Sequence, residues 1–166
     1  MNDRAPAPGA LALVQALVNT LDIESGADLL DTAEGRKPFG LAAPDVPAAR
    51  ELRESLRAVC LAHAGHPPHR DVTPLGRLLA RAPLVVSVDG HDGAATLTAA
   101  EPAPLLSQVA AAIAQALVDG TWPRLKACEA PACHWAYYDR SPACRGRWCT
   151  MSVCGARAKM RRYRAK

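Results

Sequence analysis

The sequence is poor in aromatic residues, which make up 4% of its 166 residues and include a single phenylalanine. Leu, Val and Ala must therefore fill the core, and an alanine-rich core favours helices. No apolar run approaches the roughly 18 residues of a membrane-spanning helix. The opening MNDRAPAPGA lacks the basic and apolar regions of a secretory signal. We therefore expect a cytoplasmic protein without a membrane partner, in which thiols stay reduced.

Signatures of catalysis are also missing. The sequence contains no nucleophile–base motif, no phosphate-binding loop and no paired-carboxylate signature. The histidines at 63, 66, 69 and 91 are scattered, and two of them bracket a Pro-Pro pair that is typical of a loop. We predict that the protein is not an enzyme.

Acidic residues are nearly absent from residues 121–166, which hold 11 Lys and Arg against Glu129 and Asp139, a net charge of +9. Residues 1–120 hold 9 basic and 14 acidic residues, a net charge of −5. A basic tail on an acidic body indicates a polyanionic partner, although charge alone fits a merely solvated tail equally well. Charge and cysteine content change together near residue 120, which predicts two domains, 1–120 and 121–166.

Hydrophobic spacing predicts a mainly helical first domain. Apolar residues recur at helical intervals in three segments. The first is 11–21 and the last runs from about 104 to 119, with Leu117 facing inward. The middle helix starts near Pro47, and its buried face is expected to hold Leu52, Leu56, Val59 and Cys60. Thr73 is a candidate cap for a short helix that Pro74 begins. Residues 84–88 and 95–99, separated by turn residues, predict a β-hairpin. Gly120 is placed to end the last helix of this first domain.

Five of the six cysteines fall between 128 and 154. Cys128 and Cys133 form one pair and Cys149 and Cys154 another, which is how a chain supplies four thiolates to a tetrahedral structural zinc. Thr150 or Ser152 could cap a helix at the second pair. Arg145 or Arg147 could offset the negative charge of such a centre. Cys144 and His134 are competing ligands; an adjacent histidine would strain to reach the metal of Cys133, and Cys144 lies in a loop.

The chain ends in a basic helix, expected over 151–166. Val153, Ala156, Met160 and Tyr163 form an apolar stripe, which should pack on the metal loops or the body. The cationic residues form rows on the other faces and predict contact with nucleic acid; they are Arg157, Lys159, Arg161, Arg162, Arg164 and Lys166. The alternative is that the cations only stabilise the helix dipole, which would account for two or three of them.

The motifs from Leu125 to Cys128, from Tyr138 to Ser141 and from Arg147 to Lys159 resemble the CGNR zinc finger of bacteria. Here the motif reads Cys-Gly-Ala-Arg, with Ala156 in the third place. The segment 11–31 resembles the start of the ABATE domain that precedes such fingers. The resemblance implies a stress-induced transcription regulator that holds Zn²⁺ through the four paired cysteines. We thus expect an α+β fold, a helical domain with a hairpin followed by a treble-clef-like or ribbon-like finger.

Three functions follow from these features. The first is a DNA-binding regulator whose N-terminal domain dimerises or binds a small-molecule ligand. Asn19 is a candidate residue for the ligand site, unless its side chain merely closes a helix. DNA binding would associate the protein with the nucleoid. The second is a finger that docks on protein or RNA, with Trp135, Tyr137, Tyr138 and Trp148 either stacking on bases or forming the finger's core. The third is a zinc-thiolate redox sensor.

Overall fold

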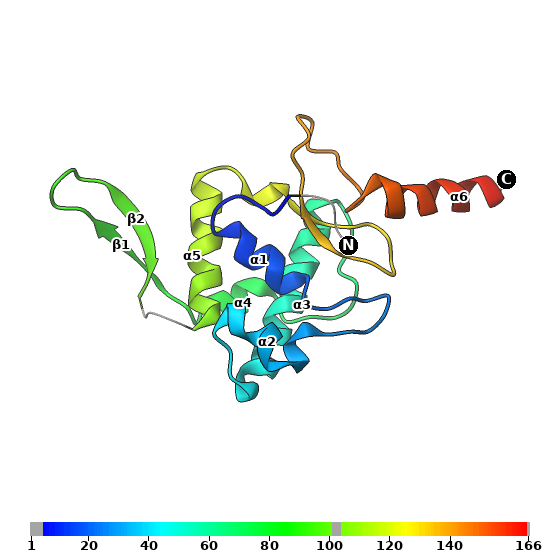
Figure 1. Cartoon of the computed structure of the whole chain (residues 1–166). Helices are drawn as coiled ribbons and strands as arrows, with labels where there is room; N and C mark the ends of the chain where they lie inside the picture. Colours follow the sequence, from blue (N-terminus) through cyan, green and yellow to red (C-terminus); the bar gives the residue numbers. More distant parts are fainter. Residues whose placement is uncertain (1–4, 101–103, 166) are drawn as a thin grey trace.

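The computed structural model describes residues 5–100 and 104–165 and combines helices with two short sheets (Figure 1). The helices are α1 (Leu11–Val18), α2 (Ala33–Arg36), α3 (Val46–His63), α4 (Leu75–Leu79), α5 (Leu105–Val118) and α6 (Ala156–Arg164). The strands form two antiparallel pairs, β1 (Leu84–Val88) with β2 (Ala95–Ala99) and β3 (Leu125–Ala127) with β4 (Ala136–Tyr138). Short 3₁₀ turns lie at Leu29–Asp31, Lys37–Phe39, Ala43–Asp45 and Trp122–Arg124. The predicted α+β class is confirmed.

Helices α1, α3 and α5 pack together around the main hydrophobic core. The buried face of α3 includes Leu52, Leu56 and Cys60, as its spacing predicted, while Val59 is half-buried. Burial raises the pKa of the Cys60 thiol to about 12, so the side chain acts as a small apolar group. The last turn of α5 departs from prediction: Leu117 is exposed, because Ala116 and Trp122 make the core contacts there.

Two helix ends differ in detail from expectation. Helix α4 begins at Leu75 without a side-chain cap, and the Thr73 hydroxyl instead donates a hydrogen bond to Glu51 (2.6 Å). Gly120 follows α5 with φ +66°, the left-handed conformation that only glycine adopts at little cost. Gly120 therefore ends α5, as the sequence predicted.

A network of charged side chains lies inside the helical body. Arg57 is 1% exposed; it donates hydrogen bonds to Glu54 and to the backbone carbonyl of Val18 (2.6 Å). Arg53 donates hydrogen bonds to Glu54 (2.7 Å) and Asp28 (2.8 Å), and all three side chains of these ion pairs are buried. These bonds attach the end of α1 and the following loop to α3.

The β1–β2 hairpin projects from the body near the start of α5 (Figure 1). Its register pairs Leu84 with Ala99 and Val88 with Ala95. The turn closes with a hydrogen bond from the Asp89 amide to the Ala94 carbonyl (2.8 Å). The predicted hairpin is therefore present, with most of its strand residues exposed.

The second sheet joins the cysteine-rich segment to the helical body. Strand β3 packs against α3, and Leu125 and Ala127 are fully buried in the main core. Asn19, at the end of α1, donates a hydrogen bond to the Ala136 carbonyl (2.9 Å) and accepts one from the Ala136 amide (2.7 Å). Asn19 thus attaches α1 to β4, and one core spans both sides of residue 120.

Candidate metal centre

The four paired cysteines converge on one point beside the second sheet. The sulfur atoms of Cys128, Cys133, Cys149 and Cys154 all lie within 4.8 Å of one another. Cys133 Sγ is 3.6 Å from Cys149 Sγ, which is 3.7 Å from Cys154 Sγ. A disulfide would require about 2.05 Å, so these are four free thiols held close together.

The spacing of the sulfurs fits a tetrahedral zinc ion. With Zn–S bonds of about 2.3 Å, the edge of the S₄ tetrahedron is about 3.8 Å, close to the two separations above. Three of the cysteines are buried and Cys133 is half-buried. A centre with four protein ligands has no position for a reacting water, which is the pattern of a structural site.

The first ligand pair lies on the turn between β3 and β4. The amides of Cys133 and His134 donate hydrogen bonds to the Ala130 carbonyl (2.8 and 3.2 Å), and the Cys128 amide donates to the Trp135 carbonyl (3.0 Å). His134 takes a positive φ of 46°, which turns the chain back into β4. The four intervening residues thus form a tight turn with both sulfurs on one side.

The second pair comes from a loop and the first turn of a helix, which favours the treble-clef-like arrangement over the ribbon. A π turn, Met151–Gly155, precedes α6, and the Gly155 amide donates to the Thr150 carbonyl (3.1 Å). Because the turn closes after five residues instead of four, Cys154 can face Cys149 across a gap of four residues. Thr150 precedes the π turn without a side-chain cap bond, and Ser152 lies inside the turn and not at its start.

The thiols influence one another's ionisation. Contact with Cys133 and Cys149 lowers the pKa of Cys128, so this sulfur ionises first. Contact with Cys128 in turn raises the pKa of Cys133, and it raises the pKa of Cys149 to about 12. Without a cation the cluster resists further deprotonation; a bound dication would stabilise the remaining thiolates and release their protons.

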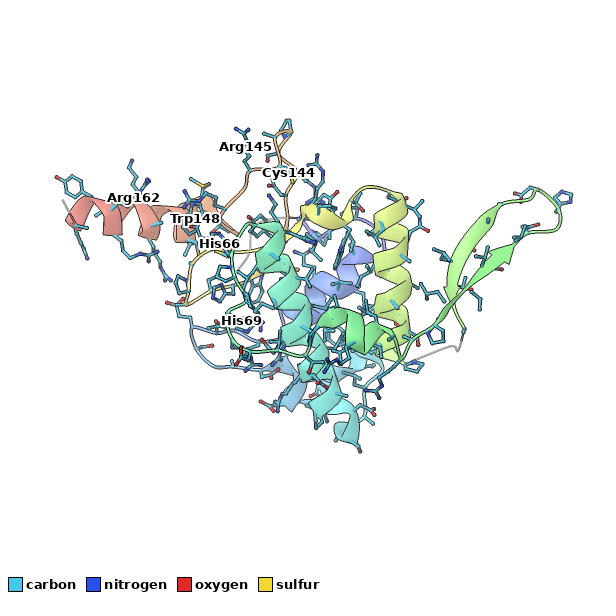
Figure 2. All side chains as sticks on the ribbon, turned by 180° about the vertical axis from the view of Figure 1, so that it is seen from behind. His66, His69, Cys144, Arg145, Trp148 and Arg162 are labelled. Atoms are coloured by element: carbon cyan, nitrogen blue, oxygen red, sulfur yellow. The ribbon has the colours of Figure 1, made fainter. Side chains whose placement is uncertain are left out.

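Three arginines lie near the centre. Arg147 is engaged with Glu129 and lies 5.3 Å over the Trp148 ring, and Arg145 is exposed on the loop (Figure 2). Arg157 lines a hollow together with Cys133, Cys149 and Cys154, and its ion pair with Glu24 raises its pKa. Arg157, which the sequence did not single out for this role, is therefore the arginine that lies beside the sulfurs.

Both competing ligands lie outside the cluster. The backbone carbonyl of Cys144 accepts a hydrogen bond from Lys126, and its sulfur is not among the four that converge. The Nδ1 atom of His134 lies 3.0 Å from the Cys128 carbonyl. Figure 2 shows Cys144 and Arg145 near the outer end of the loop, with Trp148 at the base of α6.

A buried ion pair that the sequence analysis did not identify holds this loop. The Asp139 carboxylate accepts hydrogen bonds from the Ser141 amide (3.0 Å), the Gly146 amide (2.7 Å) and the Lys126 ammonium (3.1 Å). A Cβ on Gly146 would lie 2.9 Å from Asp139 Oδ2, so a larger residue here would have to displace the carboxylate. Asp139, followed two residues later by a serine, is the one sequence signal of this arrangement.

Helix α6 is shorter and more exposed than predicted. It spans Ala156–Arg164, and the expectation that its apolar stripe packs on the body is wrong: Val153, Met160 and Tyr163 are 44%, 50% and 77% exposed. The helix starts at the edge of the finger and points away from the body, which leaves most of the stripe in solvent (Figures 1 and 2).

The basic residues of α6 fall into two groups. Lys159, Arg161, Arg162 and Arg164 are exposed along the projecting helix. Arg157 instead forms an ion pair with both carboxylate oxygens of Glu24 (3.0 and 2.9 Å), in the loop after α1. Lys166, predicted to contact nucleic acid, lies outside the described residues. One of the predicted contacts is thus engaged with the N-terminal body.

The aromatic residues of the finger are largely internal. Tyr137 is fully buried in a small core with Cys128, Cys149 and Cys154, and Trp135 and Trp148 pack against that core. Tyr138 is buried in the main core. Tyr137, Trp135 and Trp148 therefore form the finger's own core, as predicted, whereas Tyr138 packs in the main core. The burial of both tyrosines argues against their stacking on bases.

Two family models match the chain. One, described as a "putative stress-induced transcription regulator" and named ABATE, matches residues 11–120, and the other, the CGNR zinc finger, matches residues 124–166. A search of curated proteins gives no match. For the residues described, no helix is long and apolar enough to cross a membrane. The first model covers well over half of the sequence and the second contains all four converging cysteines, so the chain belongs to the ABATE family of proteins with a C-terminal CGNR zinc finger.

Proposed function

We propose that this protein is a cytoplasmic transcription regulator that binds duplex DNA through α6, and that a structural zinc ion holds the base of this helix. The observation that carries the proposal is the exposed basic helix: Lys159, Arg161, Arg162 and Arg164 project from the body on a helix whose preceding turn contains the metal-site residue Cys154. Cations on a rigid helix suit the phosphate backbone beside a major groove.

The charge distribution supports an oriented complex. Residues 1–120 carry a net charge of −5 and residues 121–166 carry +9. A polyanion is repelled by the first part and attracted by the second, so electrostatics directs DNA toward the finger. The small residues Ala156 and Ala158 add little bulk near the start of the helix, where a phosphate or a groove edge would approach.

Zinc would act as a cross-link and not as a catalyst. Cys128 and Cys133 fix the turn between β3 and β4, while Cys149 and Cys154 fix the loop and the π turn that begins the basic segment. Bound Zn²⁺ would supply folding free energy to a module whose own core is small. With four thiolates and no open position we propose no enzymatic activity.

The proposal is tested by fluorescence anisotropy of a labelled duplex over a salt series. Four to five phosphate contacts give a slope of about −3.6 to −4.5 in log K against log salt, or a roughly 150- to 500-fold loss of affinity from 50 to 200 mM salt. The variant Arg161→Gln/Arg162→Gln should reduce the slope by about 1.8. The matched control Arg77→Gln/Arg81→Gln removes two exposed charges from the other domain and should leave it unchanged.

Three results would count against the proposal. Zinc-loaded protein that fails to bind duplex at low salt would indicate that the finger docks on a protein. Stronger binding to single-stranded RNA than to duplex DNA would indicate that the half-buried Trp135 and Trp148 stack on bases. Zinc release by mild peroxide that depends on Cys144, with Cys144→Ser as control, would support a redox sensor instead.

A further inference from the structure

A hollow of about 470 Å³ lies where α6 leaves the finger, between the helix and the loop that precedes it. Arg147 and Trp148 line it on the loop side, and Lys159, Arg161 and Arg162 line it on the helix side. We call this hollow the basic cleft. Figure 2 shows Trp148 at the base of the helix that carries Arg162. The basic cleft thus brings together cations from two separate parts of the finger.

One side of α6 faces the basic cleft. Gly155, Ala158, Lys159 and Arg162 all line it and recur at intervals of three and four residues, so they share one side of the helix. Arg164 lines a separate hollow with the apolar stripe, on another side. A partner in the basic cleft would therefore meet cations and small residues of α6.

The floor of the basic cleft is closely packed around Gly155. A Cβ on this residue would lie 3.0 Å from Met151 Sδ and 3.3 Å from Trp148 Cδ1, closer than ordinary van der Waals contact. Trp148 precedes Cys149 and Gly155 follows Cys154, and the sulfurs of these two cysteines are 3.7 Å apart. The metal centre therefore holds the loop side and the helix side of the cleft together.

Arg147 is held in position on the loop side. Its Nε and Nη2 atoms donate hydrogen bonds to the two carboxylate oxygens of Glu129, and its guanidinium lies 5.3 Å from the centre of the Trp148 ring. The pair does not use Nη1, and the Arg147 side chain is 59% exposed. A guanidinium that is already oriented loses less conformational entropy when it binds a phosphate, to which its planar fork of donors is suited.

The charge of the basic cleft indicates its partner. Four cations and the carboxylate of Glu129 line it, a net charge of +3, which favours a polyanion over an apolar or a cationic partner. Lys159, Arg161 and Arg162 are exposed, like Arg147, so a long strand can pass over the cleft. A free phosphate compound would instead need a site that encloses most of its surface.

We propose that the basic cleft holds a backbone phosphate of one DNA strand, which Arg147 contacts from the loop while Lys159, Arg161 and Arg162 contact the same strand from α6. This inference rests on the proposed function. It adds a contact outside the helix, and it specifies the side of α6 that faces this strand.

The variant Arg147→Gln tests this contact in zinc-loaded full-length protein, by anisotropy of a labelled duplex over a salt series. Loss of one phosphate contact should reduce the slope of log K against log salt by about 0.9. Arg145→Gln is the matched control, because Arg145 is exposed near the outer end of the same loop and should leave the slope unchanged (Figure 2). Both arginines are exposed, so both variants should keep their zinc and their melting temperature.

Tryptophan emission gives a second measurement that does not depend on removing a charge. Trp148 is half-buried at the basic cleft, so duplex DNA bound there should change its emission. Trp148→Phe should lose this change and still bind the duplex. Inorganic phosphate, added at matched ionic strength, should leave the emission unchanged if the cleft requires a strand.

The outcomes separate this inference from the proposed function. Duplex binding with the same slope in Arg147→Gln and wild type would overturn the inference and leave the proposed function standing. Equal losses in Arg147→Gln and Arg145→Gln would also overturn it, because the attraction would then be diffuse. An emission change with inorganic phosphate but not with duplex would show that the cleft binds a free anion. Wild-type protein that binds no duplex at low salt would contradict both proposals.

Discussion

Asp139 lies beneath the loop that leads from β4 to Cys149 and is 1% exposed. Besides the two amides and Lys126, its carboxylate accepts a hydrogen bond from the Ser141 hydroxyl (2.7 Å). Burial by itself raises the pKa of Asp139, but the bonds from Ser141, Gly146 and Lys126 outweigh it and hold the pKa well below its usual range. Asp139 is therefore ionised at neutral pH, and the buried ammonium of Lys126, with its side chain 5% exposed, depends on it.

Replacing Asp139 with alanine should be severely destabilising. Removing one partner of a buried ion pair leaves the other charge uncompensated and costs roughly 3–5 kcal/mol. For a chain of this size each kcal/mol lowers the melting temperature by about 2–4 °C, so the expected fall is about 6–20 °C. Asp139→Asn keeps the shape and one acceptor for Ser141 but loses the charge, and it should lie between the wild type and Asp139→Ala.

Urea and thermal unfolding of the zinc-loaded protein measure this effect. Asp92→Ala serves as the control, because Asp92 is exposed in the hairpin turn and accepts one bond, from the Ala94 amide (2.8 Å). It should change the free energy of unfolding by about 0.5 kcal/mol or less. A loss below about 1 kcal/mol for Asp139→Ala would refute the reasoning, since it would mean that Lys126 finds water or another partner at no cost.

Four further results are expected. Chelation of the metal should abolish duplex binding and change the fluorescence of Trp135 and Trp148, which pack on the cysteine cluster. The change should persist in a Trp122→Phe background, and unchanged emission would contradict a metal-dependent finger core. Asn19→Ala removes both bonds to Ala136 and should cost roughly 1–3 kcal/mol in urea unfolding, whereas a neutral change would show that α1 and β4 are held by packing alone. Glu24→Gln frees Arg157 and should steepen the salt slope of DNA binding by about 0.9; an unchanged slope would place Arg157 away from the phosphates. Burial alone would raise the pKa of Glu54, but hydrogen bonds from His69 and Arg57 lower this pKa overall. The ionised carboxylate therefore stabilises the fold fully above pH 4.5, the ordinary pKa, and this contribution is lost as the pH falls below that value. Glu54→Gln should make the free energy of unfolding depend less steeply on pH in the acid range.

The sequence by itself identified the four cysteines that converge and much of the helical core. The spacing of Cys128, Cys133, Cys149 and Cys154 limits which sulfurs can meet, because the residues within each pair are too close along the chain to lie far apart. The periodicity of Leu52, Leu56 and Cys60 likewise defined the buried face of α3, since a helix places residues three and four apart on one side. The charge difference between residues 1–120 and 121–166 is visible without any structure.

Only the tertiary structure decided which of these faces find a partner. Periodicity identifies an apolar stripe, yet whether another element covers it depends on where the helix points: Met160 and Leu117 continue predicted stripes and are exposed. Contacts between residues distant in sequence were equally invisible, among them Asn19 with Ala136 and Arg157 with Glu24. A hydrogen bond or an ion pair needs two groups in contact, and no local pattern records which distant group folding brings within reach.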